Sequence, residues 1–416
     1  LGDLGFRTAA AKPPEAEDAP RTPAAFWHVA GATGRAFVDL QNDVTTKDVA
    51  LAAREGFGAA EHMKRYTTHG MASDQGKTGG VAGLGVLAAA TGRGMETVGT
   101  TTFRPPYVAA PIAALGAGGK GAGFAPLRLT PTHAGAAARG APMLEAGLWL
   151  RPAYYPAPGE TTWREACDRE VGMVRTAVGV CDVSTLGKIE VQGPDAAAFL
   201  DFVYANRMST LAEGRVRYGI MLREDGFVMD DGTVARLGPE RFLITTTTAA
   251  AGAVMAHLDF VHQCLRPGLD LAFASVTDHW AQVAVAGPRA REALDGIVAG
   301  PLDGEALPFM ACAGREIAGV AGRVFRISFS GELGFELAVP ARYGAALFER
   351  LCAAAGALGG GPYGMEALNV LRIEKGFLTH AELDGRTTAA DLDLGRMAGA
   401  GRDHVGAAAA RRPALV

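Results

Sequence analysis

The chain has 416 residues, of which 49% are hydrophobic and 20% are charged, and its formal net charge at pH 7 is -4. One hydrophobic core seldom serves so long a chain, so we expect two or more domains. The weak negative charge offers no general attraction to nucleic acid or to anionic membranes, and no apolar run approaches the roughly 18 residues of a spanning helix. The sequence therefore predicts neither a nucleic-acid partner nor a membrane partner.

Five cysteines are scattered along the chain without a CxxC spacing. An odd and unpatterned set predicts neither a disulfide framework nor a zinc knuckle, so we expect no metal site and a reducing cytoplasm. The chain begins at Leu1 without a basic and then apolar leader. We interpret this as the absence of a secretory signal, and the missing Met as the mark of a fragment or a processed product.

The first two regions differ in composition. Residues 1–24 are rich in Pro, Ala and charge without periodicity, which is typical of a linker. Residues 25–88 include "TTKDVALAAREGFGAAEHMKRYTTHGM", in which apolar residues recur at helical spacing. Thr45 or Thr46 can cap the first helix, with Asp48 in its first turn. We predict a small helical domain here.

The remainder of the chain has two regions that differ in composition and in hydrophobic pattern. Residues 89–145 repeat Gly and Pro, which favours an extended connector. Residues 146–400 alternate short β-like runs with amphipathic helices and contain an echo: "VQGPDAAAFL" (191–200) and "VAGPRAREAL" (285–294) share a strand end, a Gly-Pro turn and a helix start. We predict an α+β domain. The echo is explained either by an internal duplication or by a common type of connection.

Two adjacent acids end the stretch "REDGFVMDD" (223–231). If 227–237 is a strand, Asp231 falls on its more apolar face and Asp230 on the face of Arg236. We therefore expect Asp230 to be the ordinary acid of the pair. The other members of the Asp231 face are then Phe227, Met229, Thr233, Ala235 and Leu237. A desolvated carboxylate there needs a partner, such as a ligand N–H. The alternative is that both acids lie at a solvated strand end.

A lone acid also interrupts the apolar strand of "RISFSGELGFELAVP" (326–340). Glu336 stands between two apolar residues, where an acid on a strand usually points to water. Gly331 and Gly334, in the turn before it, would permit close approach of the backbone to a ligand. Both a solvated and a ligand-binding Glu336 remain open from the residues alone.

Four segments in this order, "GVCDVSTLGKIEVQGPDAAAFLDFVYAN", "YGIMLREDGFVMDDGTVARL", "FSGELGFELAVP" and "GMEALNVLRIEKGF", resemble the folate-binding aminomethyltransferase fold of the glycine cleavage T-protein. The stretch "FVDLQNDVTTKDVALAAREGFGAAEHMKRYTTHGMASDQGK", followed by "GTTTFRPPY", resembles the middle of the alpha subunit of heterotetrameric sarcosine oxidase. The resemblance covers nearly everything from about residue 30 onward. It implies a C-terminal portion of such a subunit, with a helical domain followed by a T-protein-like domain.

The resemblance implies a one-carbon transfer. In that family sarcosine is oxidised at a flavin on a partner subunit, and the resulting iminium reaches tetrahydrofolate and leaves as methylenetetrahydrofolate and glycine. Asp231 then matches the catalytic aspartate and Glu336 the pterin-binding glutamate. Phe329, Asp230 and Arg372 fall at further folate-binding positions. An ionised Glu336 can accept two N–H donors of a pterin edge, and Asp231 can accept a proton during attack on the iminium.

Departures from the family pattern keep alternatives open. T-proteins commonly have Tyr where this chain has Phe329, and Leu368 replaces an expected Arg. A scaffold subunit with a decayed folate pocket, or the folate half of a dimethylglycine dehydrogenase, would share the fold. The tRNA-modification factors of the same superfamily carry a Lys-Gly-Cys motif, where this chain has Phe377.

The segment "EHMKRYTTHGMASDQGK" gathers basic and amide side chains, and an arginine follows in "FRPPY". One interpretation is a solvated basic helix face. The resemblance implies instead an interface with the beta subunit, where Lys64, Arg65, Gln75 and Arg104 meet a flavin mononucleotide (FMN). Cationic side chains suit its phosphate.

The resemblance also implies what lies elsewhere. There is no G-x-G-x-x-G after a strand, so an NAD-binding part would belong to a missing N-terminal region. Residues 401–416 would begin a truncated C-terminal domain. The expected partners are the beta, gamma and delta subunits of sarcosine oxidase and a small-molecule folate.

Overall fold

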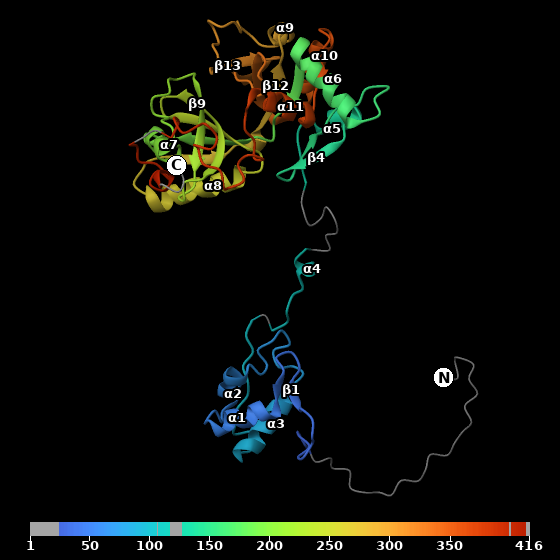
Figure 1. The fold of residues 1–416 in the computed structure, drawn as a ribbon, viewed down its shortest axis with the longest axis vertical. Helices are drawn as coiled ribbons and strands as arrows, with labels where there is room; N and C mark the ends of the chain where they lie inside the picture. The colour runs from blue at the N-terminus through green and yellow to red at the C-terminus, as the bar shows by residue number, and fades with distance from the viewer. Residues whose placement is uncertain (1–24, 106, 117–126, 399–400, 413–416) are drawn as a thin grey trace, which may run out of the picture. The chain divides into compact units, whose positions relative to one another are not determined.

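The computed structural model divides the chain into two compact units, unit 1 (Leu1–Phe124) and unit 2 (Ala125–Val416), shown in Figure 1. The described residues are 25–105, 107–116, 127–398 and 401–412. The linker predicted for 1–24 lies outside them.

Unit 1 packs short helices against a two-stranded ribbon. Its elements are β1 (Phe37–Asp39), β2 (Val44–Thr45), α1 (Thr46–Arg54), α2 (Ala60–Thr67), α3 (Gly80–Thr91) and α4 (Ile112–Leu115). Thr45 rather than Thr46 caps α1: its side chain accepts from the Asp48 N–H, and the Asp48 carboxylate accepts from the Thr45 N–H at 2.8 Å. This reciprocal capping box fixes the helix start. The core joins Val49 of α1, Met63 of α2 and Leu87 of α3 to Val98, so it extends beyond residue 88.

Unit 2 begins with a small three-stranded sheet of order β3-β5-β4. Its elements are β3 (Arg128–Leu129), α5 (His133–Ala138), β4 (Met143–Ala146) and β5 (Trp149–Pro152). The predicted extended connector, 89–145, is therefore wrong for 128–145, which is folded into unit 2. Elements of two to six residues are too short to give a periodicity signal within a Gly- and Pro-rich background.

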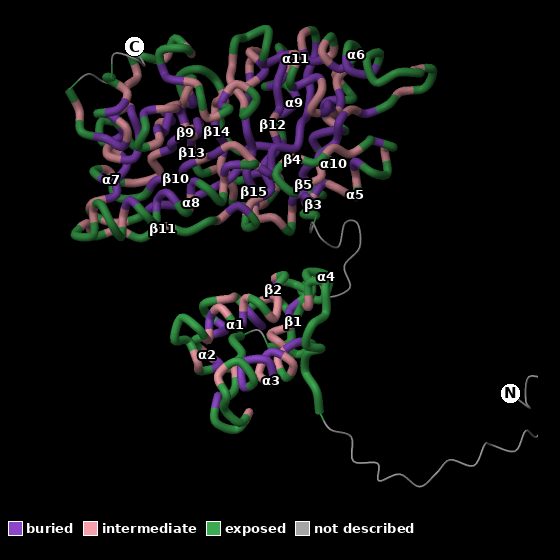
Figure 2. The backbone as a smooth tube through the Cα atoms, turned by 60° about the horizontal axis from the view of Figure 1, so that its bottom comes forward, coloured by how far each residue is buried: buried purple, intermediate pink, exposed green. Residues whose placement is uncertain are grey.

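Two large sheets form the body of unit 2, as Figure 2 shows by their buried strands. Sheet I has the order β11-β7-β10-β9-β8, with bounds β7 (Gly187–Gln192), β8 (Val216–Leu222), β9 (Val228–Gly238), β10 (Arg241–Thr246) and β11 (Ala272–Ser275). Sheet II has the order β13-β14-β15-β12-β6-β16, with bounds β6 (Gly179–Asp182), β12 (Trp280–Ala286), β13 (Cys312–Ile317), β14 (Val320–Phe325), β15 (Gly334–Pro340) and β16 (Gly361–Pro362).

Helices pack against both sheets. Their bounds are α6 (Trp163–Thr176), α7 (Ala196–Val203), α8 (Ala251–Phe260), α9 (Ala290–Leu294), α10 (Gly344–Gly356) and α11 (Met365–Lys375). Apolar residues of α7 and α8 pack on sheet I, and those of α9 and α10 pack on sheet II. The inner faces meet each other, because one buried cluster joins Ala235 of β9 and Leu243 of β10 to Phe325 of β14 and Ala338 of β15. The helices α6 and α11 pack instead on the inner face of sheet II, against Cys181 and Ala286. Two packed sheets together with these helices confirm the α+β class.

The echo in the sequence corresponds to a repeated topology. The run β7-α7-β8-β9-β10 pairs in the order β7-β10-β9-β8, and the run β12-α9-β13-β14-β15 pairs in the order β12-β15-β14-β13. The glycines after β7 and β12 share a positive φ, 137° at Gly193 and 138° at Gly287, where a Cβ would strike backbone atoms. Only glycine is tolerated in such a turn. Internal duplication remains our interpretation of this repeat.

The last described residues pack back onto sheet I. Leu383 and Ala389 join the buried cluster of Ile220 and Val228. Val405 is buried in the α7 and α8 cluster, and its N–H donates to the Phe202 carbonyl at 2.9 Å. Residues 401–412 are thus part of unit 2, rather than the start of another domain as the sequence suggested.

Candidate functional site

The position of the two aspartates is set by a bulge in β9. Asp231 pairs with Ile220 and Asp230 with Met221, but Leu222 pairs with Val228, so the register shifts there. The extra residue, Met229, packs with Met221 in the outer cluster, whereas Val228 packs with Ile220. The predicted alternation therefore fails for Val228 and Met229. It holds from Asp231 to Ala235, which places Asp231 on the inner face of sheet I.

Asp231 is a buried acid that accepts one side-chain hydrogen bond from the described part of the chain. Its side chain is 8% exposed, and the Tyr218 hydroxyl donates to its Oδ2 at 2.8 Å. Desolvation raises the pKa of Asp231 to about 6, although the Tyr218 hydrogen bond acts in the opposite direction. A carboxyl group with this pKa can both accept and release a proton near neutral pH. The alternative of a solvated strand end is excluded.

Asp230 is even more buried, at 1% exposed. It faces the outer cluster, where Thr247 donates its hydroxyl to Oδ1 at 2.5 Å and its N–H to Oδ2 at 3.2 Å. Burial raises its pKa to about 7, and the charge of Asp231 adds to the shift. The expectation that Asp230 is the ordinary acid of the pair was wrong, because Arg236, on the same face, donates to loop carbonyls at the other end of the strand.

A row of polar side chains crosses the inner face of sheet I from Asp231. Tyr218 of β8 pairs with Thr233 of β9, the Thr233 and Thr245 hydroxyls lie 2.7 Å apart, and Thr245 pairs with Lys188 of β7. The row spans two strand spacings between β9 and β7, or about 10 Å. Sequence reasoning missed Tyr218, Thr245 and Lys188. Only Lys188 had a signal, since polar residues alternate with Ile189 and Val191 along β7.

Glu336 lies on the inner face of sheet II. It pairs with Ala284 of β12 and Phe325 of β14, and its side chain is 7% exposed. The Gln282 amide donates to Oε2, and the Gln282 Oε1 has no partner. Burial raises the pKa of Glu336, while the Gln282 hydrogen bond and the Lys188 charge oppose the rise. Two acceptor oxygens, one on each side chain, thus receive no hydrogen bond from the residues that the structure describes.

The loop that precedes β15 brings an aromatic pair together. Phe329 stacks on Phe377, with ring centroids 5.9 Å apart and an interplanar angle of 20°. Gly331 adopts a φ of 82°, and a Cβ on Gly334 would approach the Ile327 carbonyl at 2.7 Å. The two glycines are thus required by the loop itself, which explains them without a ligand.

Arg372 of α11 is buried, and its guanidinium donates hydrogen bonds to neighbouring residues of the chain. It donates to Asn369 Oδ1 at 2.8 Å, to the Phe377 carbonyl at 3.1 Å and to Glu382 Oε1 at 2.7 Å. Glu382 in turn contributes to the raised pKa of Asp231. Arg372 therefore orders the segment that borders Asp231. Leu368 of the same helix is buried in an apolar cluster.

The second acid of the Gly-Glu-Leu-Gly turn has a different environment from Glu336. Glu332 accepts from Arg175 at 2.6 Å, and Arg175 also donates to Glu374 at 2.5 Å. These side chains are partly exposed. Glu332 is thus a surface ion-pair partner, and only Glu336 faces the interior between the sheets.

The four candidate residues of unit 1 lie in different environments. Lys64 is 4% exposed, and its ammonium donates to the Thr102 carbonyl and lies 3.6 Å from Glu61. Arg65 and Arg104 are exposed. The Gln75 side chain donates to the Ala72 carbonyl at 3.0 Å and accepts from the Arg104 N–H at 2.8 Å. The structure brings Gln75 and Arg104 together and leaves the two arginine side chains accessible.

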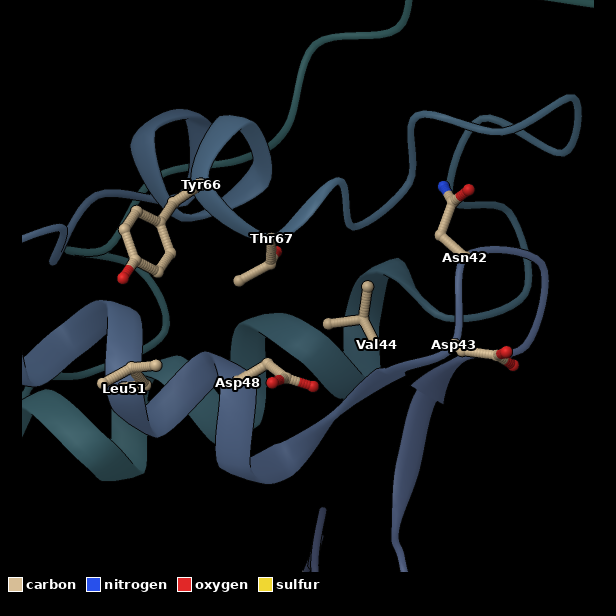
Figure 3. A pocket seen from close by; sticks show the side chains of 7 residues that line it. All are labelled: Asn42, Asp43, Val44, Asp48, Leu51, Tyr66 and Thr67. Carbon is tan, nitrogen blue, oxygen red and sulfur yellow. The ribbon is translucent and has the colours of Figure 1, made fainter.

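A pocket of about 290 Å³ in unit 1 lies between α1 and α2 (Figure 3). Its lining residues are Asn42, Asp43, Val44, Asp48, Leu51, Tyr66 and Thr67. Two carboxylates and no cation among these residues make it unsuited to a phosphate. It contains none of the predicted site residues.

Two further properties concern the described part of the chain. No helix there is both long and apolar enough to cross a membrane. No three His, Cys, Asp or Glu side chains in that part are placed to hold a metal ion together.

Comparison with known proteins decides the family. The model of the GCVT N-terminal domain matches residues 132–401, which is more than half of the chain. The chain belongs to the GCVT family. The model of the sarcosine oxidase A3 domain matches residues 33–119, within unit 1. The GCVT match contains Asp231 and Glu336.

Curated relatives of this GCVT-family chain include two kinds of enzyme. It is 50% identical over 404 residues to the sarcosine oxidase subunit alpha of Rhizobium meliloti, which covers 96% of the chain but 41% of that relative. The chain thus spans about two fifths of the length of that subunit. It is 30% identical over 268 residues to an aminomethyltransferase of Thermotoga sp., covering 64% of the chain and 70% of that enzyme.

A solved structure supports the same fold. The glycine cleavage system aminomethyltransferase T from Bartonella henselae superposes with a TM-score of 0.59 and 25% identity, over 68% of this chain and 73% of that one. The T-protein-like fold that the sequence predicted is confirmed.

Proposed function

We propose that unit 2 binds tetrahydrofolate between sheets I and II and transfers to it the methylene of the iminium derived from sarcosine. The product is 5,10-methylenetetrahydrofolate. The observation that carries the proposal is the pair of buried carboxyl groups on the inner faces, Asp231 beside Tyr218 and Glu336 beside Gln282. Buried acids with raised pKa values are costly to a fold and are typical of functional sites. Membership of the GCVT family supports the same substrate class.

Each carboxyl group has a separate part in the proposed reaction. A folate nitrogen attacks the iminium carbon, a new C–N bond forms, and the bond to the glycine nitrogen breaks as the second folate nitrogen closes the ring. The two protons lost by the folate nitrogens end on the amine of glycine. Asp231, with a pKa of about 6, can accept one of them and pass it on.

Glu336 would orient the folate rather than move a proton. Its other oxygen, Oε1, and the Gln282 Oε1 accept no hydrogen bond from the described residues, and both are suited to the N–H edge of a pterin. The stacked pair of Phe329 and Phe377 would border the ring. Arg372 would act indirectly, since it holds Glu382 and the Phe377 carbonyl.

Titration of the chain with folinic acid, followed by calorimetry or intrinsic fluorescence, tests the proposal. We expect saturable binding to the wild type and weaker binding when Glu336 is replaced by Gln. Absence of both heat and quenching would instead favour a scaffold with a decayed folate pocket. The burial of Leu368 in an apolar cluster, where the family pattern has Arg, favours that second candidate.

We further propose that sarcosine is oxidised only when this region is joined to the rest of a sarcosine oxidase, with beta, gamma and delta subunits, in the cytoplasm. FMN would lie at the interface of unit 1 with the beta subunit, and NAD would bind outside these residues. The A3 match supports this assignment over a dimethylglycine dehydrogenase. FMN would supply the redox chemistry when bound.

The side chains of unit 1 fit an FMN phosphate in part. Arg65 and Arg104 are exposed and could bind it. The ammonium of Lys64 instead donates to the Thr102 carbonyl and forms an ion pair with Glu61. We expect Arg65→Ala to reduce the flavin content of the purified complex by about tenfold, as for one charge-assisted contact. Lys64→Ala should act by loosening unit 1, which thermal unfolding would report. Unchanged flavin content in Arg65→Ala would remove Arg65 from the proposed site.

A further inference from the structure

Lys188 is a lysine almost wholly enclosed by protein. It belongs to β7 of sheet I and is 1% exposed. Its ammonium donates to the Ser184 carbonyl at 2.9 Å and to the Leu186 carbonyl at 3.0 Å. An ammonium has three donors, so two neutral acceptors leave one N–H and the whole positive charge uncompensated. A buried charge without a counter-charge is unfavourable.

The counter-charge is supplied from sheet II. Glu336 is the largest favourable charge interaction of Lys188, followed by Asp182, while Arg151 opposes and Asp278 contributes least. The relation is mutual, because Lys188 is the charged group that favours the ionised form of Glu336. Cys181 and Tyr363 are the other titratable groups that sense the Glu336 charge. No other cation is among the causes of the Glu336 shift.

Hydrogen bonds join the two residues into one network. Ser184, whose carbonyl holds Lys188, also accepts from the Gln282 N–H at 3.0 Å and donates its hydroxyl to the Gln282 carbonyl at 3.2 Å. The Gln282 amide then donates to Glu336. A rotation of any one of these side chains would break at least one contact. The network therefore fixes both the place of the positive charge and the orientation of the carboxylate.

We propose that Lys188 is a positioning residue for Glu336: it holds the carboxylate in its charged form with two acceptor oxygens, while Gln282 fixes one of them. This rests on the proposed folate binding, because a pterin edge is what the second oxygen would receive. Lys188 itself has no contact with the ligand in this proposal. Its effect is that folate binding persists at a pH where a desolvated carboxyl group would otherwise take up a proton.

The test measures the ionisation of Glu336 directly. In protein labelled with ¹³C at the glutamate carboxyl carbon, the Glu336 signal is assigned by its loss in Glu336→Gln and is followed against pH. In Lys188→Met, which keeps an unbranched side chain but removes the charge, the apparent pKa of Glu336 should rise by about 1 unit or more. Lys47→Met, at an exposed lysine of unit 1, is the matched control and should leave it unchanged. Equal Glu336 titrations in wild type and Lys188→Met would overturn the proposal.

Binding of folinic acid gives the second readout. In Lys188→Met the affinity should fall about tenfold per pH unit once the pH is below the raised pKa of Glu336, and recover at higher pH. A loss that is uniform with pH would indicate a merely structural lysine and contradict the proposal. If the wild type bound no folinic acid at any pH, the proposed function would fail, whereas the carboxyl titration would still decide the link between Lys188 and Glu336.

A reciprocal variant serves if Lys188→Met does not fold. Glu336→Gln removes the counter-charge instead, so the pKa of Lys188, which burial lowers to about 8, should fall further by about 1 unit. Labelling of the lysine ε-carbon reports it. An unchanged lysine titration would contradict the coupling on which the proposal rests.

Discussion

The inner faces of sheets I and II each carry one of the two candidate acids, but they surround it differently. Asp231 on sheet I has a neutral partner, the Tyr218 hydroxyl, and no cation among the causes of its shift, so its pKa lies at about 6. Glu336 on sheet II accepts from the amide of Gln282, and the charge of Lys188 favours its ionised form. A group near neutral pKa is suited to exchange a proton, whereas a group whose ionised form is favoured by a buried cation is suited to keep its charge. The environment, more than the residue type, assigns the two roles.

Removal of the proton acceptor should have the largest effect. In the assembled enzyme we expect Asp231→Asn to lower the rate of methylenetetrahydrofolate formation by roughly 10²- to 10⁴-fold, because an amide cannot accept the proton. Oxidation of sarcosine to formaldehyde should continue. The two products, measured separately, provide the check. An equal loss of both activities would make Asp231 structural and remove the contrast with Glu336.

Glu336→Gln should weaken folate binding by roughly tenfold to a hundredfold, as for an unsatisfied group costing about 1 to 3 kcal/mol. The new amide would present a donor either to the pterin or to Gln282. Calorimetric titration with folinic acid measures the loss. Glu332→Gln is the control, since Glu332 pairs with Arg175 at the surface, and its effect should stay within a few-fold. A larger effect at Glu332 would place the ligand at the turn instead of the strand.

Tyr218→Phe should change the pH dependence more than the maximal rate. The Tyr218 hydrogen bond lowers the pKa of Asp231, so its removal should raise that pKa. We expect kcat/KM of the wild type to rise with pH with a midpoint near pH 6, and this midpoint should increase by about 1 pH unit in the variant. Tyr204→Phe is the matched control, because the Tyr204 hydroxyl is buried without a hydrogen-bond partner. An unchanged midpoint of the kcat/KM pH profile in Tyr218→Phe would mean that a group other than Asp231 accepts the proton.

The smallest effect concerns stability. Asp230, Asp231 and Glu170 have folded-state pKa values of about 7, 6 and 7, all above their usual values. Their stabilising contribution is therefore complete below about pH 4 and is lost as the pH rises to 7, by on the order of 3 kcal/mol for a shift of two units.

Urea unfolding at pH 5 and pH 7.5 compares the wild type with Asp230→Asn. The variant should lose less stability between the two pH values, because one of the three titrating groups is gone. An identical pH dependence would mean that Asp230 ionises as readily in the folded chain as in the unfolded one.

Alternation in the sequence predicted the face of Asp231 because Ala235 follows it in unbroken register. It could not predict the bulge at Met229, since an added residue changes the register without changing the pattern of letters. It also misjudged Asp230. A shared face says little when Arg236 lies six residues along the strand, about 20 Å away.

Lys188 illustrates a second limit. Lys188, Glu190 and Gln192 alternate with Ile189 and Val191, which is the pattern of a strand with one face in water. That face is covered instead by sheet II, where Arg323 of β14 lies 3.4 Å from Glu190. The strand β14 lies more than a hundred residues further along the sequence, so only the fold reveals that this face is covered.

Central to our proposal is a single folate between the two sheets, bound through its pterin by Glu336 and with its reacting nitrogens beside Asp231. A crystal structure of the chain with bound folinic acid tests it most directly. We predict that the pterin edge will meet Glu336 and Gln282, with the folate nitrogens next to Asp231. A folate found with its pterin away from Glu336, or bound at unit 1, would contradict the claim.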